Sequence, residues 1–169
     1  MKRLHLLRHA KSSWDDPSLP DRDRPLAPRG RKAARRLARW FEEHDVRPEL
    51  VLCSPALRAT QTVDRVLAEL GSPEVAVEEG LFHASAAELL ERVQMLPDSI
   101  CEAFLVGHNP GLGDLCLLLA RPGPKRDRVA INLPTGALAV LEFDVDAWAE
   151  LEPACADLAR LVLPRELDD

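Results

Sequence analysis

Arginine and histidine side chains stand directly after three short apolar runs in this sequence. Arg8 and His9 follow the run "LHLL", and His108 follows the run "AFLV" after a single glycine. A third run, "LVLC", is followed by "SPALR", whose last residue is Arg58. Guanidinium groups bind phosphate oxygens through paired hydrogen bonds, and a neutral imidazole is a competent nucleophile near neutral pH. Brought together, these residues could bind a phosphoryl group and accept it covalently.

The elements that must position these residues follow from the hydrophobic pattern. Strands are predicted at Arg3–Leu7, Leu50–Cys53, Ala103–Val106 and Ala137–Phe143, with an edge strand at Asp157–Val162. Helices are predicted at Pro28–Asp45, Pro55–Leu70, Ser85–Leu96 and Gly111–Ala120. Strands that alternate with helices indicate an α/β fold built from parallel β-α units, and the length suits a single domain over residues 1–169.

Parallel strands present their carboxyl ends at one edge of a sheet, where ligands gather. Each of the four candidate residues follows the end of a predicted strand, so we expect them to meet at this edge. Helix N-termini at the same edge would add backbone N–H groups and partial positive charge, which favour an anion. A lone Arg-His pair is usually structural, but two arginines and two histidines delivered by three successive strand ends favour a phosphate site.

Three motifs, "LLRHAKSSW", "SPALRATQT" and "LVGHNPGL", resemble those of the histidine phosphatase superfamily, whose fold is that of phosphoglycerate mutase. The stretches "DRDRPLAPRG" and "LPTGALAVLEF" resemble its compact branch, the SixA-type phosphohistidine phosphatases. The resemblance implies a three-layer α/β/α sandwich with a mostly parallel central sheet. It implies His9 as the nucleophile, with Arg8, Arg58 and His108 completing the phosphate pocket. It also implies backbone near the phosphate at Thr135 and Gly136, for which a plain turn is the alternative.

A proton donor for the leaving group is the least defined part of the predicted site. Larger members of the family carry a glutamate at a position that, by the leucine register of "VEEGLFHASAAELL", falls here on His83. A surface histidine is the alternative for His83, and Glu79, Asp16 and Asp23 are no clean match. The P–N bond of phosphohistidine is more labile than a phosphate ester, so it demands less of a general acid. The short loop between Ser72 and Leu81 also leaves no insertion that could form a lid.

These features favour a metal-independent phosphatase, without a cofactor, that hydrolyses phosphohistidine on a partner protein through a phosphorylated His9. A phosphatase for small phosphomonoesters is the first alternative, and a non-catalytic phosphate-binding module is the second. A mutase is a weaker alternative, because such enzymes usually need a larger chain and the missing carboxylate. We expect a monomer or weak dimer.

Composition argues against other classes of partner. A net charge of −6 and an aromatic content of 4% without tyrosine argue against nucleic-acid binding. No apolar run approaches the roughly 20 residues of a membrane helix, and the run after Met1-Lys2-Arg3 is shorter than the roughly 7–15 residues of a signal peptide. A cytoplasmic location without membrane contact is therefore expected. The histidines and the four cysteines lack zinc-ligand spacing, so no metal is expected and the cysteines are predicted to be buried free thiols.

Two further segments have more than one interpretation. The first predicted helix carries six basic residues, Arg29, Arg31, Lys32, Arg35, Arg36 and Arg39. They indicate either a solvated basic face or a docking surface for an acidic partner. The stretch Arg121–Arg128 is predicted to be a surface loop, which could border the site. Ser54 is predicted to cap the following helix, with a contact to the pocket as the alternative.

Overall fold

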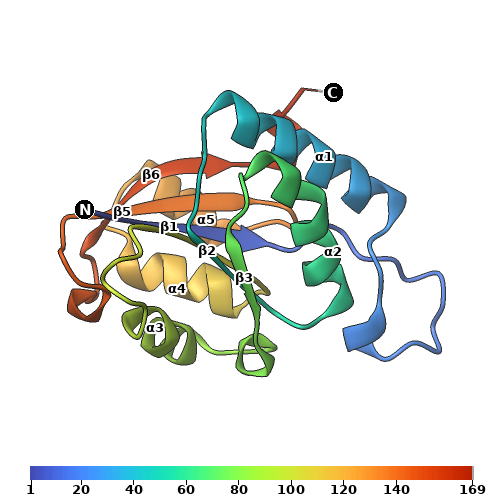
Figure 1. Cartoon of the computed structure of the whole chain (residues 1–169). Helices are drawn as coiled ribbons and strands as arrows, with labels where there is room; N and C mark the ends of the chain where they lie inside the picture. Colours follow the sequence, from blue (N-terminus) through green and yellow to red (C-terminus); the bar gives the residue numbers. More distant parts are fainter. Residues whose placement is uncertain (169) are drawn as a thin grey trace.

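The computed structural model describes residues 1–168. Its centre is a six-stranded sheet with the strand order β3-β2-β4-β1-β5-β6 (Figure 1). The strands are β1 (Lys2–Arg8), β2 (Leu50–Cys53), β3 (Glu74–Val77), β4 (Glu102–Gly107), β5 (Leu138–Phe143) and β6 (Ala156–Val162). The first four pair in parallel, whereas β5 runs antiparallel to both of its neighbours. The prediction of a mostly parallel central sheet is therefore confirmed.

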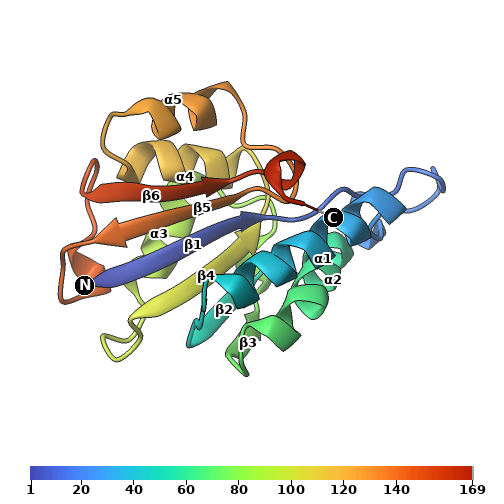
Figure 2. The same ribbon diagram turned by 90° about the horizontal axis from the view of Figure 1, so that it is seen from above.

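Helices cover both faces of this sheet (Figure 2). One face carries α1 (Pro28–Glu43) and α2 (Leu57–Val66), and the other carries α3 (Ala86–Gln94), α4 (Gly111–Leu119) and α5 (Pro124–Ile131). Alternate strand residues enter the two layers. In β1, Leu4 and Leu6 pack with α3 and α4, whereas Leu7 packs with α1 and α2. Burial on both faces explains the continuous apolar runs in the sequence and confirms the predicted three-layer α/β/α sandwich.

The predicted strands agree with the structure to within one residue at each end. The short edge strand β3 was not predicted, because its apolar run, Val75–Val77, is only three residues long. Val75 and Val77 are exposed at the edge of the sheet. The second helix begins at Leu57 rather than Pro55. These differences lie at the edge of the sheet and at helix ends, so they leave the positions of the central strand ends unchanged.

The prediction of a loop at Arg121–Arg128 is wrong, because α5 begins at Pro124 within this stretch. Proline is favoured at the first helical position, since its fixed φ angle suits the helix and its missing N–H needs no partner there. Among the residues of α5 only Val129 is buried. The apolar periodicity that would have indicated a helix is therefore absent from the sequence.

All four cysteines are free, as predicted, but only Cys53 and Cys116 are buried. Cys101 is exposed and Cys155 is half-buried, because both lie in connecting segments outside the strands and helices. Within residues 1–168, the longest and most apolar helices fall short of what crossing a bilayer requires.

Candidate active site

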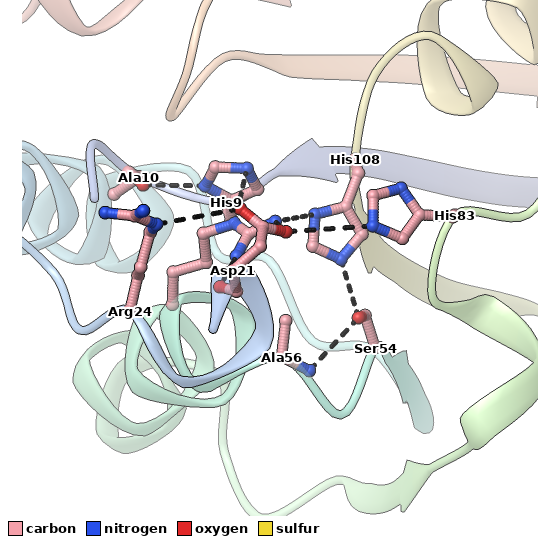
Figure 3. Close-up of polar contacts among 9 residues, drawn as sticks. His9, Ala10, Asp21, Arg24, Ser54, Ala56, His83 and His108 are labelled. Atoms are coloured by element: carbon pink, nitrogen blue, oxygen red, sulfur yellow. Dashed lines mark hydrogen bonds and ion pairs between the residues drawn. The ribbon is translucent and has the colours of Figure 1, made fainter. Parts of the chain in front are cut away.

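His9, Arg58 and His108 meet at the carboxyl ends of the parallel strands, as the sequence predicts. His9 follows β1 and His108 follows β4, and their ring centroids lie 5.0 Å apart (Figure 3). Arg58, in the first turn of α2, places its Nε 3.2 Å from His9 Nε2 and its Nη2 3.3 Å from His108 Nδ1. The exposed fractions are 6% for His9, 6% for Arg58 and 8% for His108. The three side chains thus form one buried cluster.

The backbone around His9 is held from several sides. Its N–H donates to the Gly107 carbonyl at 3.1 Å, and the next N–H, of Ala10, donates to Thr62 Oγ1 at 3.0 Å. The N–H of Gly136 donates to the carbonyls of Arg8 and His9, at 3.0 and 2.9 Å. Gly136 has a φ of +76°, a conformation that favours glycine. These contacts fix the direction of the His9 side chain before any ligand is bound.

Gly136 therefore differs from its predicted role. Its N–H is engaged by the two carbonyls, so it positions the His9 backbone instead of pointing toward a phosphate. Thr135 lines a neighbouring hollow, which is described below. No contact in the described part of the chain tests its predicted role as a phosphate ligand.

Arg58 also determines the tautomers of both histidines. Arginine carries only donors, so the ring nitrogens that it contacts, His9 Nε2 and His108 Nδ1, must be unprotonated. His9 Nδ1 then donates to the Ala10 carbonyl at 2.8 Å, and His108 Nε2 donates to Ser54 Oγ at 2.6 Å. These assignments follow from the hydrogen-bond partners. His9 therefore presents the Nε2 lone pair that nucleophilic attack requires.

The contact of Ser54 with the cluster corrects its predicted role. The residue before α2 is Ala56, and no side chain caps this helix. Ser54 Oγ accepts the Ala56 N–H at 3.3 Å and bonds to His108, so it holds the His108 ring in place.

Burial lowers the pKa of both clustered histidines. It lowers the pKa of His9 to about 4; the hydrogen bond to Ala10 opposes this shift and the positive charge of Arg58 adds to it. Burial, followed by the influence of His9 and Arg58, lowers the pKa of His108 to about 3. Both rings are therefore neutral near neutral pH, in agreement with the tautomers assigned above.

These shifts predict a loss of stability in acid. The unfolded chain binds a proton at a histidine pKa of 6.5, whereas folded His9 binds it only at about 4, so the free energy of unfolding falls as the pH falls through this window. At about pH 5, we expect each of the two histidines to lower that free energy by about 2 kcal/mol relative to about pH 7. Urea unfolding at both pH values should show a smaller acid-induced loss for His108→Asn than for the wild type. Equal losses would contradict this prediction.

Arg8 lies at the end of β1 and points toward the segment that precedes β5. Its Nη1 donates to the Leu133 carbonyl at 2.9 Å, and its Nε is buried with no hydrogen-bond partner in the described part of the chain. The positive charge of Arg8 contributes to the lowered pKa of His9, after burial, the Ala10 contact and Arg58. The charge of Arg8 thus acts on His9, while its guanidinium donates to the Leu133 carbonyl and not to a member of the cluster.

His83 lies at the rim of the cluster. Its ring is stacked against His108 with 6.0 Å between centroids, and its Nε2 lies 3.7 Å from Asp21 Oδ2 (Figure 3). The side chain is 62% exposed. Two other acid candidates have partners outside the cluster: Glu79 pairs with Arg22, and Asp16 bonds to Ser18. His83 is therefore placed where a proton donor could reach a leaving group, and its role remains a prediction.

Asp21 is a member of the site that the sequence reasoning missed. It opens a short 3-10 turn, Asp21–Asp23. Its carboxylate accepts from Arg58 Nη2 at 2.9 Å, and its carbonyl accepts from Arg58 Nη1 at 2.7 Å. A signal was present, because an arginine in a first helical turn opposes the helix dipole and needs a counter-charge. The sequence did not show which carboxylate of the preceding loop supplies it.

The comparison with known proteins decides the family. The model of the histidine phosphatase superfamily (branch 1) matches residues 4–102. The chain belongs to this superfamily. It is 35% identical over 164 residues to the uncharacterized protein Rv1276c of Mycobacterium tuberculosis, covering 94% of this chain and 100% of the relative. It is 33% identical over 160 residues to the uncharacterized chloroplastic protein At3g52155 of Arabidopsis thaliana, covering 88% and 70%.

Solved structures agree with this histidine phosphatase assignment. A protein of Nakamurella multipartitia, provisionally described as the phosphohistidine phosphatase SixA, has a TM-score of 0.85 and 28% identity, with 96% of each chain covered. The protein histidine phosphatase SixA complexed with tungstate has a TM-score of 0.78 and 25% identity, with 96% and 97% covered. The predicted phosphoglycerate mutase-like fold and the SixA-type branch are thereby confirmed. The chain is a phosphatase of this superfamily.

In this histidine phosphatase, Asp21 supplies the counter-charge that faces Arg58. Burial raises the pKa of Asp21, but the hydrogen bond and positive charge of Arg58 outweigh it, so the net pKa is lowered. The carboxylate is therefore ionised at neutral pH and unsuited to act as an acid. Its other oxygen lies 4.0 Å from Arg24 Nε. Asp21 thus orients Arg58 while placing a negative charge beside the cation that a phosphate would need.

Replacing Asp21 by asparagine is expected to tighten the binding of an anion. The amide oxygen can keep the bond to Arg58, while the like charge that repels a phosphate is lost. We expect the inhibition constant of inorganic phosphate to fall by about tenfold, since a partly screened like charge costs on the order of 1 kcal/mol. Asp16→Asn, in the same loop but bonded to Ser18, is the control and should leave this constant unchanged. A higher constant for Asp21→Asn would contradict the prediction.

Proposed function

We propose that this histidine phosphatase hydrolyses phosphohistidine on another protein through a phosphorylated His9. The observation that carries the proposal is the state of His9: a neutral, buried ring whose Nε2 lone pair faces the guanidinium of Arg58. A phosphoryl group bound by that guanidinium would replace the hydrogen bond from Arg58 Nε to His9 Nε2 and so bring its phosphorus to the Nε2 lone pair. Phosphohistidine is the substrate that suits the weak proton donors of the site.

In the first step, His9 Nε2 would attack phosphorus while the P–N bond of the substrate breaks. The leaving imidazole takes a proton from His83 or from water at the exposed rim and departs as a neutral ring. Arg58 and Arg8 would stabilise the charge on the equatorial oxygens, and neutral His108 would hold Arg58 in place. The Ala10 carbonyl, which accepts from His9 Nδ1, would stabilise the positive charge that the ring gains.

In the second step, water would attack the phosphorus of phospho-His9. The new P–O bond forms as the P–N bond to His9 breaks, so inorganic phosphate leaves and the neutral ring is restored. The protons of the water remain with the phosphate or pass to solvent. The cations that held the first transition state would hold the second, because both have the same geometry.

The acid machinery supports phosphohistidine as the substrate. Asp21 is the carboxylate bound to the cluster, and its lowered pKa keeps it ionised. His83 remains as a proton donor, at an exposed rim. An imidazole leaving group needs less protonation than an alkoxide, so a weak acid suffices for it. The similarity to proteins described as SixA, one of them bound to the tetrahedral oxyanion tungstate, supports the same choice.

The test compares kcat/KM for a phosphohistidine-bearing protein with kcat/KM for a sugar phosphate. We expect the phosphohistidine protein to be preferred by about 100-fold or more. The alkoxide that leaves from an ester must be protonated, and the site offers only His83 as a donor. His83→Ala should lower turnover of the ester more than that of the phosphohistidine protein. Preference for the ester would instead establish a phosphatase for small phosphomonoesters. Phosphate binding without turnover of either would establish a non-catalytic module.

A further inference from the structure

A hollow of about 830 Å³ lies beside the loop that carries His9. Six cationic side chains line it, namely Lys11, Arg29, Lys32, Arg36, Arg128 and Arg165. The other lining residues are small, polar or aliphatic, and within residues 1–168 none of the lining residues is acidic or aromatic. We call this hollow the basic groove. It concentrates positive charge in a chain whose net charge is −6.

The basic groove adjoins the backbone segments that hold His9. Lys11 stands two residues after His9, and its carbonyl accepts the N–H of Ala27 just before α1 at 2.9 Å. On the opposite wall, Thr135 precedes Gly136, whose N–H holds the Arg8 and His9 carbonyls. Figure 2 shows the segment after β6, in red, between α5 and α1. A ligand in the basic groove would therefore contact the two backbone segments that flank His9, through Lys11 and Thr135.

The charges in the first turn of α1 do not stabilise the helix. The first turn of α1 holds no acidic residue, although acidic residues are preferred there. Arg29 is instead the second residue of this helix and is exposed. Cations near a helix N-terminus each cost about 0.3–1 kcal/mol. An arrangement that opposes the dipole while lining a hollow points to the binding of an anion. Arg128, across the basic groove, already pairs with Glu166 at 2.6 Å.

We propose that the basic groove docks an acidic segment of the phosphohistidine-bearing protein, a proposal that rests on the proposed function. Lys11, Arg29 and Arg165 would bind Asp and Glu side chains. Ile131, which is 86% exposed, and the partly buried Leu161 would contact the aliphatic residues between them. Docking beside His9 would raise the local concentration of the phosphoryl group and steer its approach.

A protein segment fits the basic groove better than a nucleic acid does. Base stacking requires aromatic side chains, and the lining residues of the described chain include none. A long polyanion would also extend beyond the basic groove onto a chain that is acidic overall. A short acidic segment avoids both problems, because it needs only the cations and aliphatic residues that line the hollow.

Charge reversal at two exposed residues of the basic groove provides the first test. In Arg29→Glu/Arg165→Glu, we expect kcat/KM for a phosphohistidine-bearing protein at low salt to fall by about tenfold or more through KM. Turnover of p-nitrophenyl phosphate, which is too small to fill the basic groove, should not change. The control is Arg35→Glu/Arg39→Glu, which makes the same charge change on exposed positions of α1 outside the basic groove. Equal losses in the two variants would overturn the proposal.

The second test separates the basic groove from the catalytic proposal. Fluorescence anisotropy would measure binding of a fluorescein-labelled peptide of Asp and Glu residues, without phosphohistidine, to the wild type and both variants. We expect the Arg29→Glu/Arg165→Glu variant to bind at least about tenfold more weakly than the control variant. Failure of the wild type to bind would overturn docking even if phosphohistidine is hydrolysed. Tighter, equally groove-dependent binding of single-stranded oligothymidylate would overturn the choice of a protein partner.

Discussion

A His9→Ala variant is expected to lose both turnover and the covalent phosphoenzyme. His9 Nε2 is the neutral nitrogen that faces Arg58, so its removal leaves the pocket without the group that would take the phosphoryl group. Loss of a nucleophile typically lowers kcat by about 10⁴-fold or more, because the remaining groups only bind and orient. Incubation with a labelled phosphohistidine-bearing protein, followed by an alkaline quench, should leave label on the wild type alone.

The matched control for this prediction is His44→Ala. His44 follows α1, where it is exposed and stacks on Trp40 with 4.0 Å between ring centroids. It should retain both label and turnover. Label on His9→Ala, or turnover comparable to that of the wild type, would remove His9 from the mechanism. Such a result would direct attention to His108, whose Nδ1 also faces Arg58.

The fold and the central cluster of the site, His9, Arg58 and His108, were predictable because both depend on the central strands. The strands β1, β2 and β4 are buried on both faces, so their apolar runs end sharply where the chain reaches the edge of the sheet. Adjacent pairing of β1 and β2 with β4 then brings His9, Arg58 and His108 together. Their convergence follows from topology and needs no detail of side-chain packing.

The residues that sequence reasoning missed or misplaced depend on loops. Asp21 reaches Arg58 only because a short 3-10 turn folds back over α2, and no periodic pattern marks such a turn. The engaged N–H of Gly136 depends in the same way on a positive φ angle. The helix α5 buries too little surface to leave an apolar pattern, and the apolar run of β3 is only three residues long. Contacts that depend on loop geometry were therefore not predictable from the sequence alone.

Arg58 occupies a special place in this arrangement, because its guanidinium joins every other member of the cluster. Nε contacts His9, Nη1 contacts the Asp21 carbonyl, and Nη2 contacts both the Asp21 carboxylate and His108. A bound phosphate would have to share these donors or displace Asp21 from them. The same guanidinium also keeps both rings in the tautomers described above. Its geometry, and not its charge alone, therefore organises the site.

An Arg58→Lys variant is accordingly expected to lose about 10³-fold in kcat/KM although the charge is conserved, since a single ammonium cannot replace a planar fork of donors. The ammonium can satisfy one partner, so His9 and His108 lose their common donor and Asp21 loses its bidentate hold. Steady-state kinetics would test this, together with tungstate binding, which should weaken in parallel. Arg65→Lys, near the end of the same helix with a bond to the Gln61 carbonyl, is the control and should behave as the wild type. If Arg58→Lys retained wild-type kcat/KM, charge alone would suffice and the proposed role of the guanidinium geometry would be wrong.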